Sequence, residues 1–250
     1  MHYITASNFG YIEYIRVAIY NFINDFEGDF LHILCLDSPI YDELKTISES
    51  NNNIILYQDV DDIQGFHAFN QGCYIQICIK KFEFVRKILN ENDGLFYYFD
   101  SDVFFYKSPT KYLEEKLSNV DILFQQDAPV SYGHPLGHTY VCAGNFCLRK
   151  TENSIKFLNE VSQLFPHNPG LNDQEVMYKY LMSTCEENLV WNYKDAKLNI
   201  LDPNLFQNGY DAILNGWFDK HDRYCVHVNH IIGNDNKMAA FNTLIKNKKQ

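Results

Sequence analysis

Two carboxylates, Asp100 and Asp102, stand on either side of Ser101 and directly follow a short apolar and aromatic segment, residues 94–99. A segment of this kind, bounded by turn residues, is typical of a strand covered on both faces. Loops at the carboxyl ends of such strands are where α/β proteins bind ligands. Two anionic oxygen donors one residue apart suit Mg²⁺ or Mn²⁺. The spacing therefore indicates a metal site, with a polar turn as the alternative because short motifs often match by chance.

A second group of polar residues lies near the end of the chain. His227 and His230 are followed by Gly233 and Lys237. Histidine is a frequent metal ligand, lysine is a point-charge partner for phosphate, and glycine lets the backbone approach a ligand closely. We expect a strand over residues 225–229, so that His230 falls where that strand ends and is the candidate ligand.

The elements that must position these residues alternate between strand and helix over the first hundred residues, which predicts a parallel sheet covered by helices. Strands are expected at residues 2–5, 30–36, 53–57 and 94–99, and helices at 11–26, 41–48 and 74–89. Beyond Pro109 the expected strands are 120–125, 144–148, 190–193, 198–201 and 225–229, and the expected helices are 152–165, 173–182 and 238–246. We find no linker and expect one domain over residues 1–250.

Composition excludes several classes of function. With 21 basic and 32 acidic residues the formal net charge is −11, which opposes sequence-independent binding to nucleic acid. The seven cysteines form an odd set without a Cys-x-x-Cys pair, so neither a disulfide framework nor a zinc cluster is expected. The first residues do not show a basic n-region followed by an apolar h-region, and no apolar run approaches the length of a membrane span. The expectation is a soluble, cytoplasmic protein without an integral membrane segment.

Four stretches together carry a resemblance to a known family. They are residues 95–105 with the Asp-x-Asp pair, residues 143–146 (Ala-Gly-Asn-Phe), residues 172–175 (Asn-Asp-Gln-Glu), and His230-x-x-Gly233 followed by Lys237. The chain resembles the metal-dependent glycosyltransferases of the GT-A fold, and more narrowly the retaining nucleotide-diphospho-sugar transferases of families 8 and 77. Family 8 usually spaces its Gly and Lys by two residues and continues with Pro-Trp, whereas here three residues intervene. Residues 206–210 (Phe-Gln-Asn-Gly-Tyr) are similar to family 77.

The resemblance implies an α/β fold made of a single GT-A (Rossmann-like) domain with a mainly parallel central sheet. Residues 1–108 would bind the nucleotide, and residues 109–250 would bind the donor sugar and the acceptor. The implied reaction moves a hexosyl or pentosyl group from a UDP-sugar to a glycan, protein or small-molecule acceptor with retention of anomeric configuration.

The resemblance also assigns roles to residues. Asp100, Asp102 and His230 would hold the cation, and the softer histidine ligand favours Mn²⁺ slightly over Mg²⁺. Gln174 would face the anomeric carbon and Asp173 would bind sugar hydroxyls. The remaining donor-binding candidates are Thr5, Ala6, Ser7, Ser101, Asp127, Gly144, Asn145, Gly233 and Lys237.

Most of these residues have a structural alternative. Asp173 is also a good N-cap for the helix that follows, residues 144–145 can form a β-turn, and Asp127 can be a turn residue. Lys80 and Lys81, on the helix before the Asp-x-Asp strand, would reach phosphate or lie on a solvated helix face. A loop with His134 and His138 is a candidate cover for the acceptor.

Three other functions compete with the transferase. A nucleotidyltransferase also uses an Asp-x-Asp pair, but it usually has a glycine-rich basic loop after its first strand, and residues 5–8 form no such loop. A phosphatase that forms an aspartyl phosphate would normally place its pair after the first strand. An inactive nucleotide-sugar-binding or carbohydrate-binding protein is the non-enzymatic alternative.

Overall fold

The computed structural model describes residues 1–59, 61–65, 67, 72–127, 141–182, 191–193, 196–216 and 222–248. Its central sheet has eight strands in the order β3-β2-β1-β4-β7-β6-β9-β8. The pairings make β7 and β8 run opposite to the other six strands. The bounds are β1 His2–Ser7, β2 Phe30–Cys35, β3 Ile54–Gln58, β4 Leu95–Phe99, β6 Ile122–Gln126, β7 Val141–Arg149, β8 Trp191–Tyr193 and β9 Ala196–Ile200.

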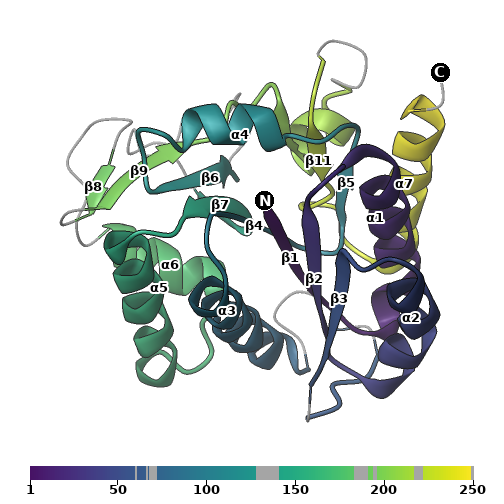
Figure 1. Ribbon diagram of the computed structural model, residues 1–250, viewed down its shortest axis with the longest axis horizontal. Helices are drawn as coiled ribbons and strands as arrows, with labels where there is room; N and C mark the ends of the chain where they lie inside the picture. Colours follow the sequence, from purple (N-terminus) through teal and green to yellow (C-terminus); the bar gives the residue numbers. More distant parts are fainter. Residues whose placement is uncertain are drawn as a thin grey trace.

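Helices cover both faces of this sheet (Figure 1). One face packs against α1, α2 and α4, and the other against α3, α5 and α6. Strand β4 shows why both faces must be covered, because Tyr97 and Phe99 enter the first layer while Phe96 and Tyr98 enter the second. The helices are α1 Ile12–Asp25, α2 Ser38–Ser50, α3 Tyr74–Glu91, α4 Thr110–Lys116, α5 Glu152–Leu164, α6 Asp173–Met182 and α7 Asn234–Lys248.

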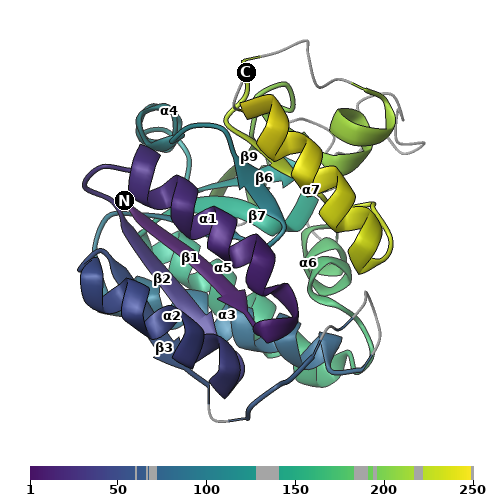
Figure 2. The same cartoon turned by 90° about the vertical axis from the view of Figure 1, so that its right-hand side faces the viewer.

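The last helix, α7, packs against α1 beside this sheet. Figure 2 shows α7 lying next to α1, and residues of both helices share one apolar cluster. The Lys248 ammonium lies 2.6 Å from an Asp25 carboxylate oxygen, and the Tyr14 hydroxyl lies 2.9 Å from the Asn234 side-chain oxygen. These contacts fix the last helix, and with it Lys237 in its first turn.

A second, three-stranded sheet has the order β10-β11-β5, formed by Phe206–Asn208, Cys225–His227 and Val103–Phe105. Strand β5 follows the Asp-x-Asp turn directly and pairs antiparallel with β11, so that His227 lies opposite Val103. The Val228 amide also donates to the Asp102 carbonyl oxygen at 3.0 Å. This register brings the end of β11 to the exit of β4, although more than a hundred residues separate them in sequence.

The expected α/β fold with a mainly parallel central sheet is confirmed. The three-stranded sheet was not expected, because β5 and β10 have three residues each and three residues cannot display a reliable alternation. Helix α4 was not predicted either, because its 7 residues are too few to show a clear helical pattern. Within the described residues, no helix is long and apolar enough to cross a membrane.

Candidate functional site

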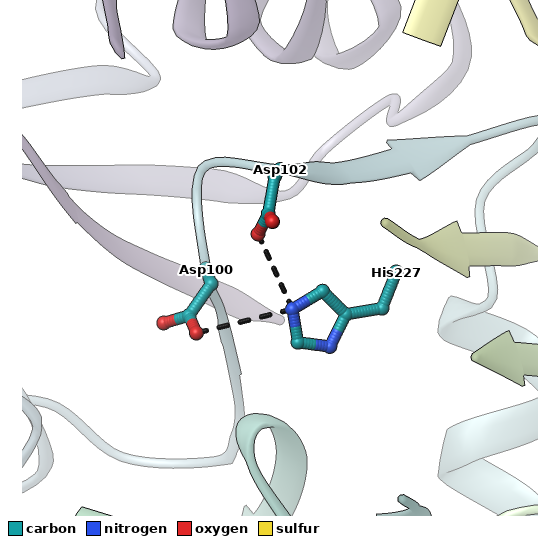
Figure 3. A group of neighbouring side chains, drawn as sticks. All are labelled: Asp100, Asp102 and His227. Carbon is teal, nitrogen blue, oxygen red and sulfur yellow. Dashed lines mark ion pairs between the residues drawn. The ribbon is translucent and has the colours of Figure 1, made fainter. Parts of the chain in front are cut away.

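Three side chains converge where β4, β5 and β11 meet. Figure 3 shows the His227 ring with one nitrogen directed at the carboxylates of Asp100 and Asp102. That nitrogen, Nε2, lies 3.9 Å from Asp100 Oδ2 and 3.2 Å from Asp102 Oδ1. One possible ligand atom from each residue lies within 4.8 Å of the others. This mixed set of hard oxygen and imidazole nitrogen donors fits a divalent cation such as Mn²⁺.

Gly144, on β7, explains how the three side chains come so close. A Cβ atom at this position would lie 2.6 Å from His227 Cε1 and 2.8 Å from Asp100 Cγ. The Gly144 carbonyl also accepts from the Asp100 amide at 2.7 Å. The strand therefore leaves the space of one side chain empty, and the site occupies it. The β-turn alternative does not hold, since Gly144 lies inside a strand.

The outer oxygen of Asp100 is held from the other side. Tyr98 donates its hydroxyl to Asp100 Oδ1 at 2.8 Å, and Lys81 Nζ lies 3.6 Å from the same oxygen. Burial and the neighbouring carboxylate raise the pKa of Tyr98 well above its usual value, so the phenol stays a donor. Asp100 is thus oriented with Oδ2 toward His227.

Asp102 is buried and forms an ion pair with Lys237 through Oδ2, while Oδ1 faces His227. Burial alone would raise the pKa of Asp102, but the positive charge of Lys237 outweighs it and holds that pKa well below its usual value. Asp102 is therefore a carboxylate at any pH at which the protein would work.

Lys81 links Asp100 of the candidate metal site to Asp173 at the start of α6. Its side chain is only 4% exposed and forms a close ion pair with Asp173 in addition to its contact with Asp100. Burial by itself would lower the pKa of Lys81, but the two carboxylates reverse this and raise it, so the lysine remains charged. The solvated-face alternative is wrong for Lys81, whereas Lys80 pairs with Asp59 and Asp61 instead.

Asp173 is the first residue of α6 and does not cap it. Asn172 Oδ1 accepts from the Glu175 amide, and Glu175 Oε2 accepts from the Asn172 amide, both at 2.9 Å. This reciprocal pair is a capping box, with Asn172 in the N-cap position. Asp173 is left free to bind Lys81 and to accept from the Gln174 amide at 2.8 Å.

Asp127 directly follows β6 and contacts the side chains of Gln174, Asn229 and His230. Its carboxylate accepts from Gln174 Nε2 at 2.8 Å and from Asn229 Nδ2 at 2.7 Å. His230 Nε2 lies 3.0 Å from the Asp127 carbonyl oxygen and 3.5 Å from the carboxylate. The hydrogen bond with Asp127 raises the pKa of His230. Burial alone would raise the pKa of Asp127, but the hydrogen bond with His230 outweighs burial and lowers that pKa.

The structure therefore brings His227 to the Asp-x-Asp pair and places His230 against Asp127. The sequence carried a signal for this arrangement. Val226 and Val228 pack in the apolar cluster with α1 and α7, so the residue between them must point to the opposite face of β11. The assignment of His230 as a metal ligand stays a prediction that the described contacts do not favour.

The other predicted donor-binding residues surround the same strand ends. Ser101 donates its hydroxyl to the Ala6 carbonyl oxygen at 3.1 Å, which ties the Asp-x-Asp turn to the end of β1. Thr5 and Ser7 are buried there as well. Gly233 has a φ of +88° just before α7, a conformation that suits glycine. His134 and His138 lie outside the described residues.

Asn145 behaves differently from the other candidates. Its side chain is fully buried, and Nδ2 lies 3.6 Å from the sulfur of Cys225. Because Gly144 faces the site, the alternation of the strand turns the next side chain to the opposite face. Any contact of Asn145 with a donor would have to use its backbone.

This α/β scaffold, with two carboxylates at the exit of a central strand, has the GT-A fold. The chain belongs to the nucleotide-diphospho-sugar transferase family, whose model matches residues 29–241. None of the curated proteins matches its sequence.

Solved structures share the fold at low sequence identity. The WbbM bifunctional glycosyltransferase matches with a TM-score of 0.63 and 12% identity over 99% of this chain and 49% of its own. GlyE from Streptococcus pneumoniae TIGR4 gives 0.59 and 14% over 100% and 60%. The galactosyltransferase LgtC, solved with donor and acceptor sugar analogues, gives 0.59 and 13% over 100% and 95%. The chain thus spans about half of WbbM and 60% of GlyE.

Proposed function

We propose that the protein transfers a sugar from a UDP-sugar to an acceptor in a metal-dependent reaction that retains the anomeric configuration. The observation that carries this proposal is the double contact of Lys81, which joins Asp100 of the cation-binding group to Asp173 beside Gln174. One cluster of side chains would thereby hold groups for the leaving diphosphate and groups for the sugar. Residues 1–108 would bind the nucleotide, and residues 109–250 the sugar and acceptor.

Asp100, Asp102 and His227 would hold the cation. When bound, Mn²⁺ or Mg²⁺ would act as a Lewis acid for the charge that develops on the diphosphate. The imidazole nitrogen in this set favours Mn²⁺. Lys237 places a second positive charge at Asp102 and is the candidate to hold the departing phosphates.

Gln174 and Asp173 would act on the sugar. As the anomeric carbon becomes oxocarbenium-like, a carbonyl oxygen on its opposite face stabilises the positive charge. The Gln174 amide nitrogen donates to Asp127, and its amide oxygen is the candidate for this role. Asp173, fixed by Lys81 and by the Gln174 amide, would bind sugar hydroxyls.

An amide is a weak nucleophile, so we favour a route without a covalent glycosyl-enzyme. The leaving phosphate oxygen would take the proton of the acceptor hydroxyl while that hydroxyl attacks the same face of the sugar. Mass spectrometry of the protein with donor alone tests this route, and a glycosylated Gln174 or Asp173 peptide would contradict it.

The function is tested by a thermal-shift panel of nucleoside diphosphates and nucleotide sugars, with and without Mn²⁺. A ligand at about a hundred times its Kd adds roughly 2.7 kcal/mol, which for a domain of this size raises Tm by about 5 to 10 °C. We expect a shift with UDP or a UDP-sugar that requires Mn²⁺ and is lost in Asp102→Asn. Asp93→Asn, at a side chain that is 97% exposed, is the matched control and should keep the full shift.

No shift with any nucleotide would refute the proposal. A shift that ignores Mn²⁺ would refute the metal assignment alone. The anomeric configuration of the product, read by NMR, decides between retention and inversion.

A further inference from the structure

The second nitrogen of His227 has a partner that the proposed reaction does not use. Nδ1 lies 3.0 Å from the side-chain oxygen of Gln125 on β6. Both residues are buried, with 3% and 0% of their surface exposed. A polar contact between two fully buried side chains is costly to leave unsatisfied, so each strongly constrains the other.

The orientation of the Gln125 amide follows from its other contacts. Its nitrogen, Nε2, lies 2.8 Å from the Gln207 carbonyl oxygen and 3.3 Å from the Phe206 carbonyl oxygen, both on β10. Carbonyl oxygens only accept hydrogen bonds, so the NH₂ group must face β10. The amide oxygen must then face His227, and it can only accept.

The hydrogen on His227 is therefore assigned by the backbone of β10. Because the Gln125 oxygen that faces Nδ1 can only accept, Nδ1 must carry the hydrogen. The lone pair of the neutral ring is then on Nε2. Nε2 is the nitrogen that faces Asp100 and Asp102. Cys142 Sγ lies 3.4 Å from Nδ1 and, as a weak acceptor, is compatible with the same hydrogen position.

We propose that Gln125 is a positioning residue that keeps the hydrogen of His227 on Nδ1 and so presents Nε2 for metal binding. Without Gln125, the two carboxylates would favour a neutral ring with its hydrogen on Nε2, where it blocks the ligand atom. This inference rests on the proposed metal-dependent function and adds to it a residue outside the cation-binding group. Partners that orient a metal-bound histidine commonly change metal affinity 10- to 100-fold when they are removed.

The test uses Gln125→Leu in the full chain and two readouts. Mn²⁺ affinity, measured by electron paramagnetic resonance of the free ion, should fall about 10- to 100-fold. In protein with ¹⁵N-labelled histidine and no metal, the Nδ1–H signal of His227 should be present and slow to exchange in the wild type and lost in the variant. Gln207→Met is the matched control, because it changes a side chain that is equally buried but keeps the backbone carbonyl that Gln125 uses.

Gln125→Glu separates positioning from packing. Its carboxylate still accepts from Nδ1 but cannot donate to β10, so Tm should fall while Mn²⁺ affinity falls much less than in Gln125→Leu. Unchanged affinity in Gln125→Leu, a retained Nδ1–H signal, or an equal loss in Gln207→Met would overturn the proposal. If the wild type and Asp102→Asn show the same weak Mn²⁺ binding, the proposed function itself fails, whereas the Nδ1–H signal still reports on Gln125.

Discussion

Replacing Gly144 by alanine is the sharpest perturbation of the candidate metal centre, because it adds one methyl group to the space that the site occupies. The new Cβ atom would lie 2.6 Å from His227 Cε1 and 2.8 Å from Asp100 Cγ, whereas ordinary contact begins at 3.4 Å. The ring must therefore move by 0.8 Å and the carboxylate by more than 0.6 Å, because Asp100 Oδ2 would lie closer still to the new Cβ atom; otherwise the strand must shift by a similar distance. His227 is buried and bound to Gln125, so it cannot rotate away freely.

These movements are large for a metal site. Ligand distances in well-formed sites hold to within about 0.2 Å, so the alanine variant displaces two of the three ligands by several times that tolerance. We expect Mn²⁺ affinity to fall by at least a hundredfold, which is about 2.7 kcal/mol. Transfer should fall at least as much at a fixed, low concentration of Mn²⁺.

The assay is a titration with Mn²⁺ followed by electron paramagnetic resonance, combined with thermal unfolding in the absence of metal. Ala143→Gly is the control, because Ala143 is buried in the apolar cluster of α3, α5 and α6 and the loss of its methyl group should reduce Tm without changing Mn²⁺ affinity. Wild-type affinity in a folded Gly144→Ala protein would refute the assignment of the cation to this space.

Three other predictions follow from buried charges and polar groups. Burial and the nearby His2 lower the pKa of His32 to about 4 in the folded protein, so the unfolded chain binds a proton there at higher pH than the folded state does. The free energy of unfolding should therefore decline as pH falls from about 6.5 to about 4, by roughly 3 kcal/mol at 1.36 kcal/mol per pKa unit. Urea unfolding across that pH range should show a shallower decline in His32→Gln, and equal slopes would contradict the assignment. Lys81→Met leaves Asp100 and Asp173 without their cation and should lower the free energy of unfolding by about 3 kcal/mol and turnover by more than tenfold, whereas Lys80→Met should do neither. Asp127→Asn removes an acceptor of the Gln174 amide and should lower kcat more than tenfold with little change in donor Kd; an equal change in both would make Asp127 a binding residue.

Much of the fold could be predicted because local pattern and burial coincide. Strand β4 is apolar on both faces, and a segment of that kind is stable only inside a covered sheet. The stripe of α3 and the turn residues after it place β4 and its exit within a residue or two. Asp100 and Asp102 could therefore be located at a ligand-binding edge before any contact was known.

The second sheet and the bridging lysine could not be predicted in this way. Strands β5, β10 and β11 each have three residues, and their pairing joins segments that are far apart in sequence. Lys80 and Lys81 are chemically identical neighbours, and only the packing of α3 against β4 and α6 decides which of them is buried between two carboxylates.

The sequence by itself determined the α/β scaffold, the position of the Asp-x-Asp pair and the helix that begins at Asp173, because each depends on contacts between near neighbours. Only the tertiary structure decided that His227 joins the pair while His230 binds Asp127. The physical reason is register. The pairing of β11 with β5 sets which face of the strand meets the carboxylates, and a shift of one residue would turn His227 away.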